Sequence, residues 1–431
     1  MSDQIKQTDK ISLLGAVSIG IGGMVGGGIF AVLGLAVSMA KGATPLAFLI
    51  AGIITAFTAY SYQKMSLAFP DRGGTVRFLN ESFGVGMFSG TMNNLLWVNY
   101  IIMLALYASA FGAYAPNLIS ISGNENLDTH IYSTIILLFS TGINYYSLSI
   151  VGKVESFAVV LKLLILLAFV SLCGFGLGGS HFVHQLSFEY WVGPVPLIAG
   201  GMVIFVAYEG FELIANSAPD IENPKRNISR AYLISVVFVI CLYVIIAAIT
   251  VGSLSFEAIT NAEEYVLAEA ARPVLGSLGF TIITFTALIS TFSAINATIL
   301  GSSRVNFEVA KDKELFPFFA QNFHGKPIGL VVILFLALLL VNTMNIANIS
   351  IAGSIGFLLV FSCVNFSAFI KAKEINGSRI VFFTGGVLTL LALVILLLEQ
   401  WEENIIGILV FLVVLLVCWL TEKVYRVRYQ E

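Results

Sequence analysis

The chain has 431 residues, of which 58% are hydrophobic and only 11% are charged. Soluble domains carry about 25% charged residues, so this composition excludes a water-soluble protein and indicates a polytopic membrane protein. The formal net charge of −3 says little by itself, and we expect no nucleic-acid partner. The four cysteines all fall in apolar stretches without metal or disulfide spacing, at Cys173, Cys241, Cys363 and Cys418.

Apolar stretches long enough to cross a bilayer recur along the whole chain. About 20 apolar residues suffice for one span, and only short polar loops separate these stretches, so we expect one transmembrane domain over residues 1–431. Twelve spans are predicted, at residues 12–38, 45–66, 85–112, 131–148, 155–177, 195–218, 230–252, 276–302, 328–344, 349–370, 379–398 and 404–421.

The basic residues fix the orientation. Of the 22 Lys and Arg residues, Lys41 and Arg272 fall in outer segments, Lys162 falls within a span, and the other nineteen fall in inner segments. Cytoplasmic loops carry such an excess of positive charge, so we expect both termini in the cytoplasm.

Six of the eleven residues from Gly20 to Phe30 are glycine, inside the first span. Glycine weakens a helix by about 1 kcal/mol relative to Ala, and open backbone within a membrane is tolerated where it lines a cavity. We therefore expect a helix broken near mid-membrane, whose free amides and carbonyls suit a zwitterionic solute. Close helix packing through small residues such as Gly22 and Gly26 is the alternative.

Polar residues also lie within the third and fifth spans. Asn93, Trp97 and Tyr100 share one helix face, and either line a wet path or bond to other helices. Lys162 lies about seven residues inside its span, roughly 10 Å from the inner end. Its ammonium group either reaches back toward water, or belongs to a buried amine that gains and loses a proton. A charge within a membrane indicates a functional site by default.

The sixth span contains two carboxylates and a glycine, Glu209, Glu212 and Gly210. The carboxylates either form the functional site or an internal pair that stabilises the bundle. Glycine-interrupted helices at positions one and six are typical of two five-helix inverted repeats. We place these repeats at about 12–177 and 195–370, with additional helices at about 379–421.

Hydroxyl groups are dense in the eighth span, at Ser290, Thr291 and Ser293. They either bond to their own helix carbonyls or form a small cation site against the broken first helix. Oxygen ligands without carboxylates suit Na⁺, or a Lys ammonium placed where Na⁺ would bind.

Four stretches match the pattern of a known family: GGGIF at 26–30, YEGFE at 208–212, IENPKRNI at 221–228, and 304–317 with its AKDKELFP. Through them nearly the whole chain resembles the amino acid–polyamine–organocation superfamily. The likeness is strongest to prokaryotic proton-coupled permeases with a lysine in helix 5, here Lys162. The resemblance implies an all-α membrane protein of the leucine-transporter type, with ten core helices in two inverted repeats plus two more, in a prokaryotic inner (plasma) membrane.

The resemblance also implies roles for individual residues. The amides of Gly26, Gly27 and Gly28 would bind the substrate carboxylate. The substrate ammonium would be received by carbonyls of Met24, Phe205, Val206 and Glu209, and Phe205 resembles an aromatic gate. Lys162 would lie between the backbone near Gly22 and the hydroxyls of Ser290 and Ser293. Tyr100 and Glu212 are further candidates for selectivity or proton transfer. Two residues depart from the family pattern, Gly27 in place of a common Ser and Glu209 in place of an apolar residue.

The expected activity is Na⁺-independent, proton-coupled symport of small neutral amino acids by alternating access, without a cofactor, a metal or an obligate protein partner. The glycines leave room for a solute, but the site offers no dedicated anion partner. A cationic amino acid or polyamine is the alternative, because Glu209 and Glu212 could pair with a second ammonium group. An ion channel would need a repeated filter sequence and a membrane enzyme a catalytic constellation; neither is found, so we expect no enzyme.

Overall fold

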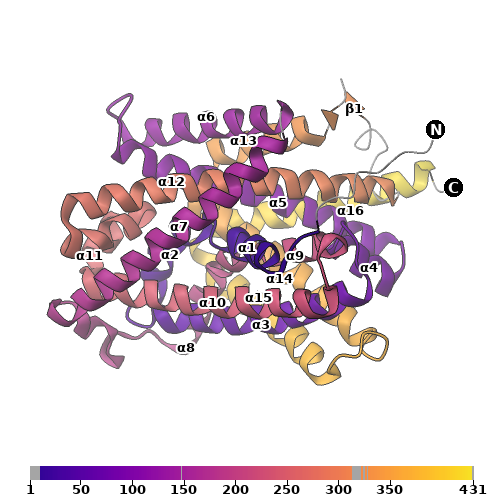
Figure 1. The fold of residues 1–431 in the computed structure, drawn as a ribbon, viewed down its shortest axis with the longest axis horizontal. Coiled ribbons are helices and arrows are strands. Elements are labelled where there is room, and N and C mark those ends of the chain that lie inside the picture. The colour runs from indigo at the N-terminus through magenta and orange to yellow at the C-terminus, as the bar shows by residue number, and fades with distance from the viewer. Residues whose placement is uncertain (1–9, 147, 313–321, 324–325, 328, 430–431) are drawn as a thin grey trace.

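Helices form almost all of the computed structural model, which describes residues 10–429 except 147, 313–321, 324, 325 and 328 (Figure 1). Within that part of the chain the only strands are β1 (Asn322–Phe323) and β2 (Lys326–Pro327), which pair antiparallel. The expected inner cations Lys6 and Lys313, and the family motif from Lys313 onward, lie outside the described residues.

The helices follow in chain order as α1 (Leu13–Met24), α2 (Gly28–Ala40), α3 (Thr44–Ala68), α4 (Thr75–Phe83), α5 (Met87–Tyr114), α6 (Glu125–Tyr146), α7 (Leu148–Gly176), α8 (Pro194–Val203), α9 (Leu213–Asn216), α10 (Pro224–Ser253), α11 (Phe256–Asn261), α12 (Val266–Lys311), α13 (Gly329–Thr343), α14 (Ile346–Ile370), α15 (Arg379–Glu403) and α16 (Ile405–Tyr429). Local sequence explains several starts. Ser12 caps α1 by accepting from the Gly15 amide, α8 and α10 each begin with a proline, and Asn345 caps α14.

Eight of the described helices are long and apolar enough to cross a bilayer: α3, α5, α7, α10, α12, α14, α15 and α16. Two further spans consist of helix pairs bent at a break, α1 with α2 by 45°, and α8 with the segment 205–216 by 47°. The prediction of an all-α membrane protein is therefore confirmed. Neither α6 nor α13, which has only 15 residues, is among these ten, so the total of twelve spans stays a prediction.

Several helical segments were not predicted, among them α11, which lies between two predicted spans. The short helix α4 occupies a segment that the sequence analysis left as a loop. Helix α12 begins at Val266, ten residues before the predicted span, and Glu269 and Arg272, which were predicted to lie in an outer loop, form an ion pair at 2.9 Å along this helix. The predicted boundary falls at a kink, where Gly276 adopts a φ of 63°.

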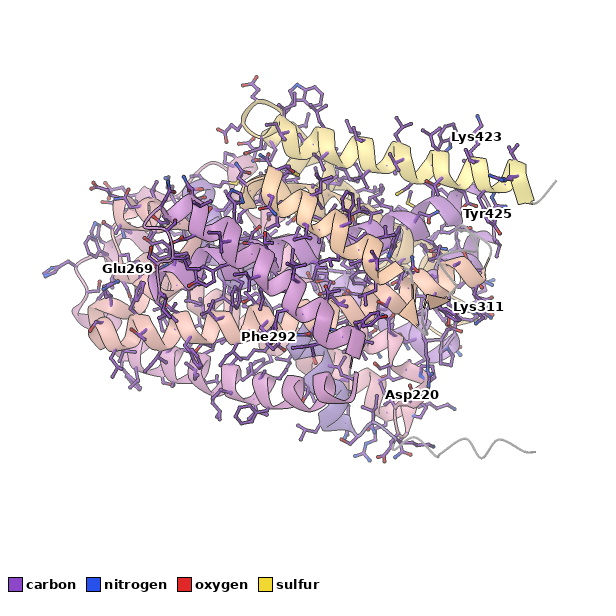
Figure 2. The ribbon with its side chains drawn as sticks, turned by 90° about the horizontal axis from the view of Figure 1, so that it is seen from above. Asp220, Glu269, Phe292, Lys311, Lys423 and Tyr425 are labelled. Carbon is purple, nitrogen blue, oxygen red and sulfur yellow. The ribbon has the colours of Figure 1, made fainter. Side chains whose placement is uncertain are left out.

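The broken helices lie inside the bundle. Helix α1 packs against α10, α5 packs against α12 and α14, and α1 lies near the middle of the view in Figure 1. Helices α15 and α16 lie outside this group and pack against α14. In Figure 2, Lys311 and Lys423 lie toward one end of the bundle and Glu269 toward the opposite end. This separation places two of the predicted inner cations together, away from a predicted outer carboxylate.

The two breaks touch through glycines. A Cβ added to Gly23, in the last turn of α1, would lie 2.9 Å from the Gly210 Cα. Gly210 lies between α8 and α9 with a φ of 114°, and its own added Cβ would lie 2.6 Å from the Met24 amide nitrogen. Only glycine fits both the conformation and the space at Gly210.

This contact yields a stability prediction. We expect Gly210→Ala to lower the thermal unfolding temperature of the purified protein, because overpacking costs about 1–3 kcal/mol and the positive φ adds strain. Gly178→Ala is the matched control, since no heavy atom lies within 4 Å of its added Cβ. Fluorescence-detected size-exclusion chromatography after heating measures both. Equal unfolding temperatures for the two variants would show that the contact does not restrain the fold.

Candidate functional site

The connection between α1 and α2 presents free backbone amides. Among the described residues, no hydrogen-bond acceptor binds the amide N–H of Gly26, Gly27 or Gly28, and all three are buried. Gly27 lies against the Tyr107 ring, whose Cγ would be 3.0 Å from an added Cβ, and Gly28 lies against Ala207. Free amides at the N-terminus of a helix as long as α2 favour an anionic group such as a carboxylate.

Hydroxyl groups bind the opened carbonyls of the first break. The Tyr243 hydroxyl donates to the Met24 carbonyl oxygen at 2.6 Å and lies 3.2 Å from the Ala207 carbonyl oxygen. The Ser290 hydroxyl lies 3.0 Å from the carbonyl oxygen of Val25 and 3.1 Å from that of Gly26. The carbonyl of Met24, expected to receive a substrate ammonium, therefore accepts from Tyr243 in this conformation.

The second break is held by α14. The short 3₁₀ segment η5 (Phe205–Tyr208) follows α8, and the Val206 amide donates to the Ser354 hydroxyl at 3.2 Å. Ser350 and Ser354 both donate to the Val203 carbonyl, at 2.8 and 3.0 Å. The Val206 carbonyl accepts from the Glu209 amide at 3.3 Å. These bonds satisfy backbone groups that the break would otherwise leave open.

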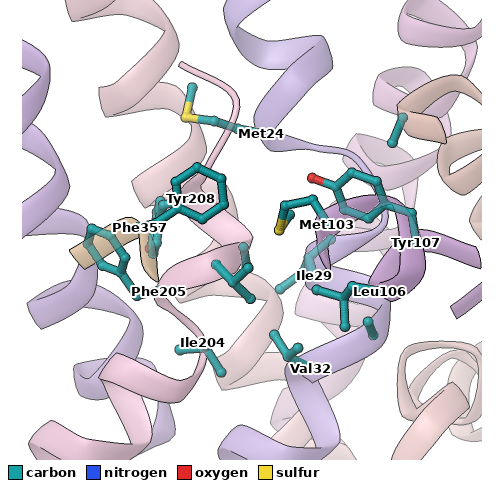
Figure 3. Packing of buried hydrophobic residues seen from close by; sticks show 14 of the residues in the cluster. Met24, Ile29, Val32, Met103, Leu106, Tyr107, Ile204, Phe205, Tyr208 and Phe357 are labelled. Carbon is teal, nitrogen blue, oxygen red and sulfur yellow. The ribbon is translucent and has the colours of Figure 1, made fainter. Parts of the chain in front are cut away.

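Aromatic side chains enclose the space between the breaks. The Phe205 ring is buried and packs edge-on against Phe361, with 6.0 Å between ring centroids. Figure 3 shows Phe205 and Tyr208 from one break packed in the same cluster as Met103 and Tyr107 of α5. Phe205 is thus positioned as a wall between α8 and α14.

Two tyrosines of α5 bind the two carboxyl groups. The Tyr107 hydroxyl donates to Glu209 Oε2 at 3.0 Å, and the Tyr100 hydroxyl donates to Glu212 Oε1 at 3.2 Å. Glu212 also accepts from the Gly210 amide at 2.8 Å. Both carboxyl groups are buried, and within the described part of the chain no Lys or Arg pairs with either.

A small cavity adjoins this cluster. Its volume of about 10 Å³ for the centre of a water-sized sphere leaves room for about one water molecule. It is lined by Gly23, Gly210, Glu209, Tyr100, Tyr107, Leu213, Ala294, Ala297 and Thr298. The structure therefore shows the site closed, with polar groups from α5 and the second break around it.

Lys162 lies on the other side of α1. Its side chain is fully buried, and its Nζ donates to the Gly22 carbonyl at 3.0 Å. Val159, almost one turn earlier on α7, fills the space beside Gly22. Ser290 reaches the next residues of the same break, and Ser293 is buried on the same helix α12. The structure thus brings Lys162 to Gly22 and Ser290 to Val25 and Gly26.

Several neighbours of the site were not among the predicted residues. Tyr107 lies two helical turns after Tyr100 on α5, so its spacing could have indicated a shared face. Ser350 and Ser354 are likewise one turn apart on α14. Tyr243 lies in an otherwise apolar part of α10, and no sequence pattern indicated that it lies near the site. On the face predicted on α5, Asn93 bonds to another helix, which was the alternative to lining a wet path. Its Nδ2 donates to Asn80 Oδ1 of α4 at 3.0 Å.

Known proteins resemble this chain over most of its length. A family profile described as amino acid permease matches residues 11–427. The chain is 33% identical over 413 residues to an uncharacterized protein of Methanocaldococcus jannaschii, covering 93% of this chain and 94% of that protein. It is 28% identical to the inner membrane transport protein YbaT of Escherichia coli, over 91% of each chain. It is 26% identical to the serine/threonine exchanger SteT of Bacillus subtilis, over 86% of this chain and 85% of that one.

The free amides yield a prediction. We expect Gly27→Val and Gly28→Val each to abolish solute uptake, because a β-branched side chain would fill the space between these amides and Tyr107 or Ala207. Gly142→Val on α6 is the control, since its added Cβ has no neighbour within 4 Å. Uptake into cells is compared at equal amounts of membrane-inserted protein. Normal uptake by either variant would contradict the proposed site.

Proposed function

We propose that this chain, which belongs to the amino acid permease family of the amino acid–polyamine–organocation superfamily and is thus an amino acid transporter, carries small neutral amino acids together with protons. The observation that carries the proposal is the buried Lys162 ammonium, bound at 3.0 Å to the Gly22 carbonyl of the broken helix. No Na⁺ is required in this mechanism, because the charge that stabilises the break belongs to the protein.

The substrate would bind at the first break. Its carboxylate would accept hydrogen bonds from the free amides of Gly26, Gly27 and Gly28. Its ammonium would approach the carbonyls of Met24, Phe205, Val206 and Glu209, of which that of Met24 now accepts from Tyr243. The close packing of Gly27 on Tyr107 and of Gly28 on Ala207 favours a small side chain. The printed name of SteT, a serine/threonine exchanger, supports the same size class.

Coupling would act through α1. While Lys162 is protonated, its hydrogen bond to Gly22 ties α7 to the last turn of α1. Loss of that proton to the cytoplasm would neutralise Lys162, weaken its hydrogen bond to Gly22 and favour opening of the inner pathway. Proton uptake from outside would restore the charged lysine and this hydrogen bond. The two inverted repeats, at about 12–177 and 195–370, would move against each other while the helices at about 379–421 stay peripheral.

One observation favours a second substrate class. Glu209 and Glu212 are buried without a described basic partner, and a substrate with a second ammonium group would supply the missing charge. A cationic amino acid or a polyamine is therefore the alternative. The room for about one water in the adjoining cavity requires Tyr107 or Leu213 to move before such a group could enter.

Glu209→Gln separates these classes. For a carrier of small neutral amino acids we expect the variant to bind serine and alanine nearly as well as the original protein, because Gln keeps the size of Glu and can still accept from Tyr107. Scintillation-proximity binding across all amino acids and polyamines measures this, with Glu257→Gln on the exposed face of α11 as control. Selective loss of lysine, arginine or polyamine binding would establish the alternative. Equal loss of every substrate would assign Glu209 to proton transfer or folding.

Lys162→Ala tests the coupling. We expect it to retain substrate binding and exchange but to lose uptake driven by an inward proton gradient, because the solute contacts lie on the breaks and not on α7. Uptake into proteoliposomes is measured with pH and Na⁺ set on each side, with and without a protonophore. Lys373→Ala, an exposed loop lysine, is the control and should remain proton-driven.

Two outcomes would overturn the coupling proposal. Strict Na⁺ dependence of the original protein is the first. Full proton-driven uptake by Lys162→Ala is the second. A steady single-channel current in planar bilayers would further contradict a carrier mechanism.

A further inference from the structure

An apolar groove runs between α5 and α16, away from the broken helices. Its volume is about 590 Å³, within the roughly 300–1,000 Å³ of ligand sites. Two faces form its walls: Met87, Phe88, Thr91 and Met92 from α5, and Leu412, Leu415, Leu416 and Trp419 from α16. The side chains of Phe88, Leu416 and Trp419 are 40% or more exposed. The groove thus offers a long apolar surface on the outside of the bundle.

A cation stands at one end of this groove. Lys423, one turn after Trp419, is exposed, and its Nζ lies 5.0 Å from the centre of the Trp419 ring (Figure 2 labels Lys423). Within the described part of the chain Lys423 forms no ion pair. The neighbouring Arg426 differs, because its charge is matched by the buried Glu422 on the same helix at 2.6 Å. One uncompensated positive charge therefore lies where the apolar walls end.

Glu422 holds the end of α16 that carries Lys423 against α5. Its carboxyl group is fully buried and packs directly on Gly90 of α5, where any side chain would collide with it. Asn94, one turn further along α5, lies 3.5 Å from Glu422 Oε2. The end of α16 that carries Lys423 is thus held against α5, and the groove between the two helices keeps its shape.

We propose that this groove binds an anionic phospholipid of the inner leaflet, with an acyl chain along the apolar walls and the phosphate against Lys423. Tryptophan and lysine typically lie together at the membrane interface, where the indole contacts the headgroup region and the lysine reaches the phosphates. A second copy docked here across a twofold axis would bring two Lys423 charges into one interface, whereas a phosphate supplies the opposite charge. Charge complementarity therefore favours the lipid.

Quenching of Trp419 by brominated lipids tests the proposal. The full chain is reconstituted into phosphatidylcholine vesicles that contain the same low mole fraction of either brominated phosphatidylglycerol or brominated phosphatidylcholine. The chain has four tryptophans, so the Trp419 signal is the difference between the original protein and Trp419→Phe. We expect brominated phosphatidylglycerol to quench this signal about twofold more strongly. The lipid occupies both leaflets, so the result does not depend on protein orientation.

The variants assign the preference to Lys423. Lys423→Gln should reduce quenching by brominated phosphatidylglycerol to the level of brominated phosphatidylcholine and leave the latter unchanged. Arg379→Gln is the matched control, because Arg379 is also exposed and stacks on an aromatic ring, that of Phe369, away from the groove. It should keep the full preference.

Three results would overturn the proposal. Equal quenching of Trp419 by the two brominated lipids would show that the groove does not select an anionic headgroup. If Lys423→Gln kept the stronger quenching by brominated phosphatidylglycerol, Lys423 would not be the cause of the lipid preference. Weak quenching by both lipids, together with a Trp419 signal that varies with protein density in the vesicle, would assign the groove to a second copy of the chain.

Discussion

The backbone contact between Gly23 and Gly210 is the constraint on which the rest of the structure depends. Two helices are broken at the same depth of the bundle, and their open ends meet without side chains between them. Open backbone within a membrane has no water to bind, so its amides and carbonyls need partners from the protein. Tyr243, Ser290 and Ser354 supply these partners from three other helices. The amides of Gly26, Gly27 and Gly28 remain open among the described residues, and in the proposed function they bind the solute carboxylate.

The last turn of α1 is held on two faces by different chemistry. Gly22 and Gly23 are consecutive, so their sides of the helix point about 100° apart. On one side, Lys162 donates to the Gly22 carbonyl; on the other, Gly23 packs on Gly210 beside the carboxyl pair. In the proposed coupling, a change of charge on Lys162 would therefore act on the same turn that borders the cavity. Neither group needs to contact the solute to influence whether α1 can move.

The sequence predicted the features that depend on composition within one segment. Six glycines in eleven residues indicated the first break, and Lys162 and Glu209 stood out because charges are rare in apolar spans. Contacts between distant segments could not be predicted in this way. In the sequence, Tyr243 is an ordinary aromatic residue of an apolar segment, and only the fold brings its hydroxyl to Met24. Likewise, no neighbouring residue in the sequence indicates the kink at Gly276. Acidic and basic residues before Gly276 resembled a loop although they pair along a helix.

The two buried carboxyl groups are bonded across the closed site. Glu209 and Glu212 bond to Tyr107 and Tyr100, and both tyrosines belong to α5. The Tyr107 ring also rests on Gly27, so the residue that binds the carboxyl group of the second break also covers the free amides of the first. In the proposed site, a solute that reaches those amides would displace Tyr107, and this displacement would break the bond from Tyr107 to Glu209. Opening of the proposed site would then also free the carboxyl group of Glu209, so that solute binding and the surroundings of Glu209 would change together.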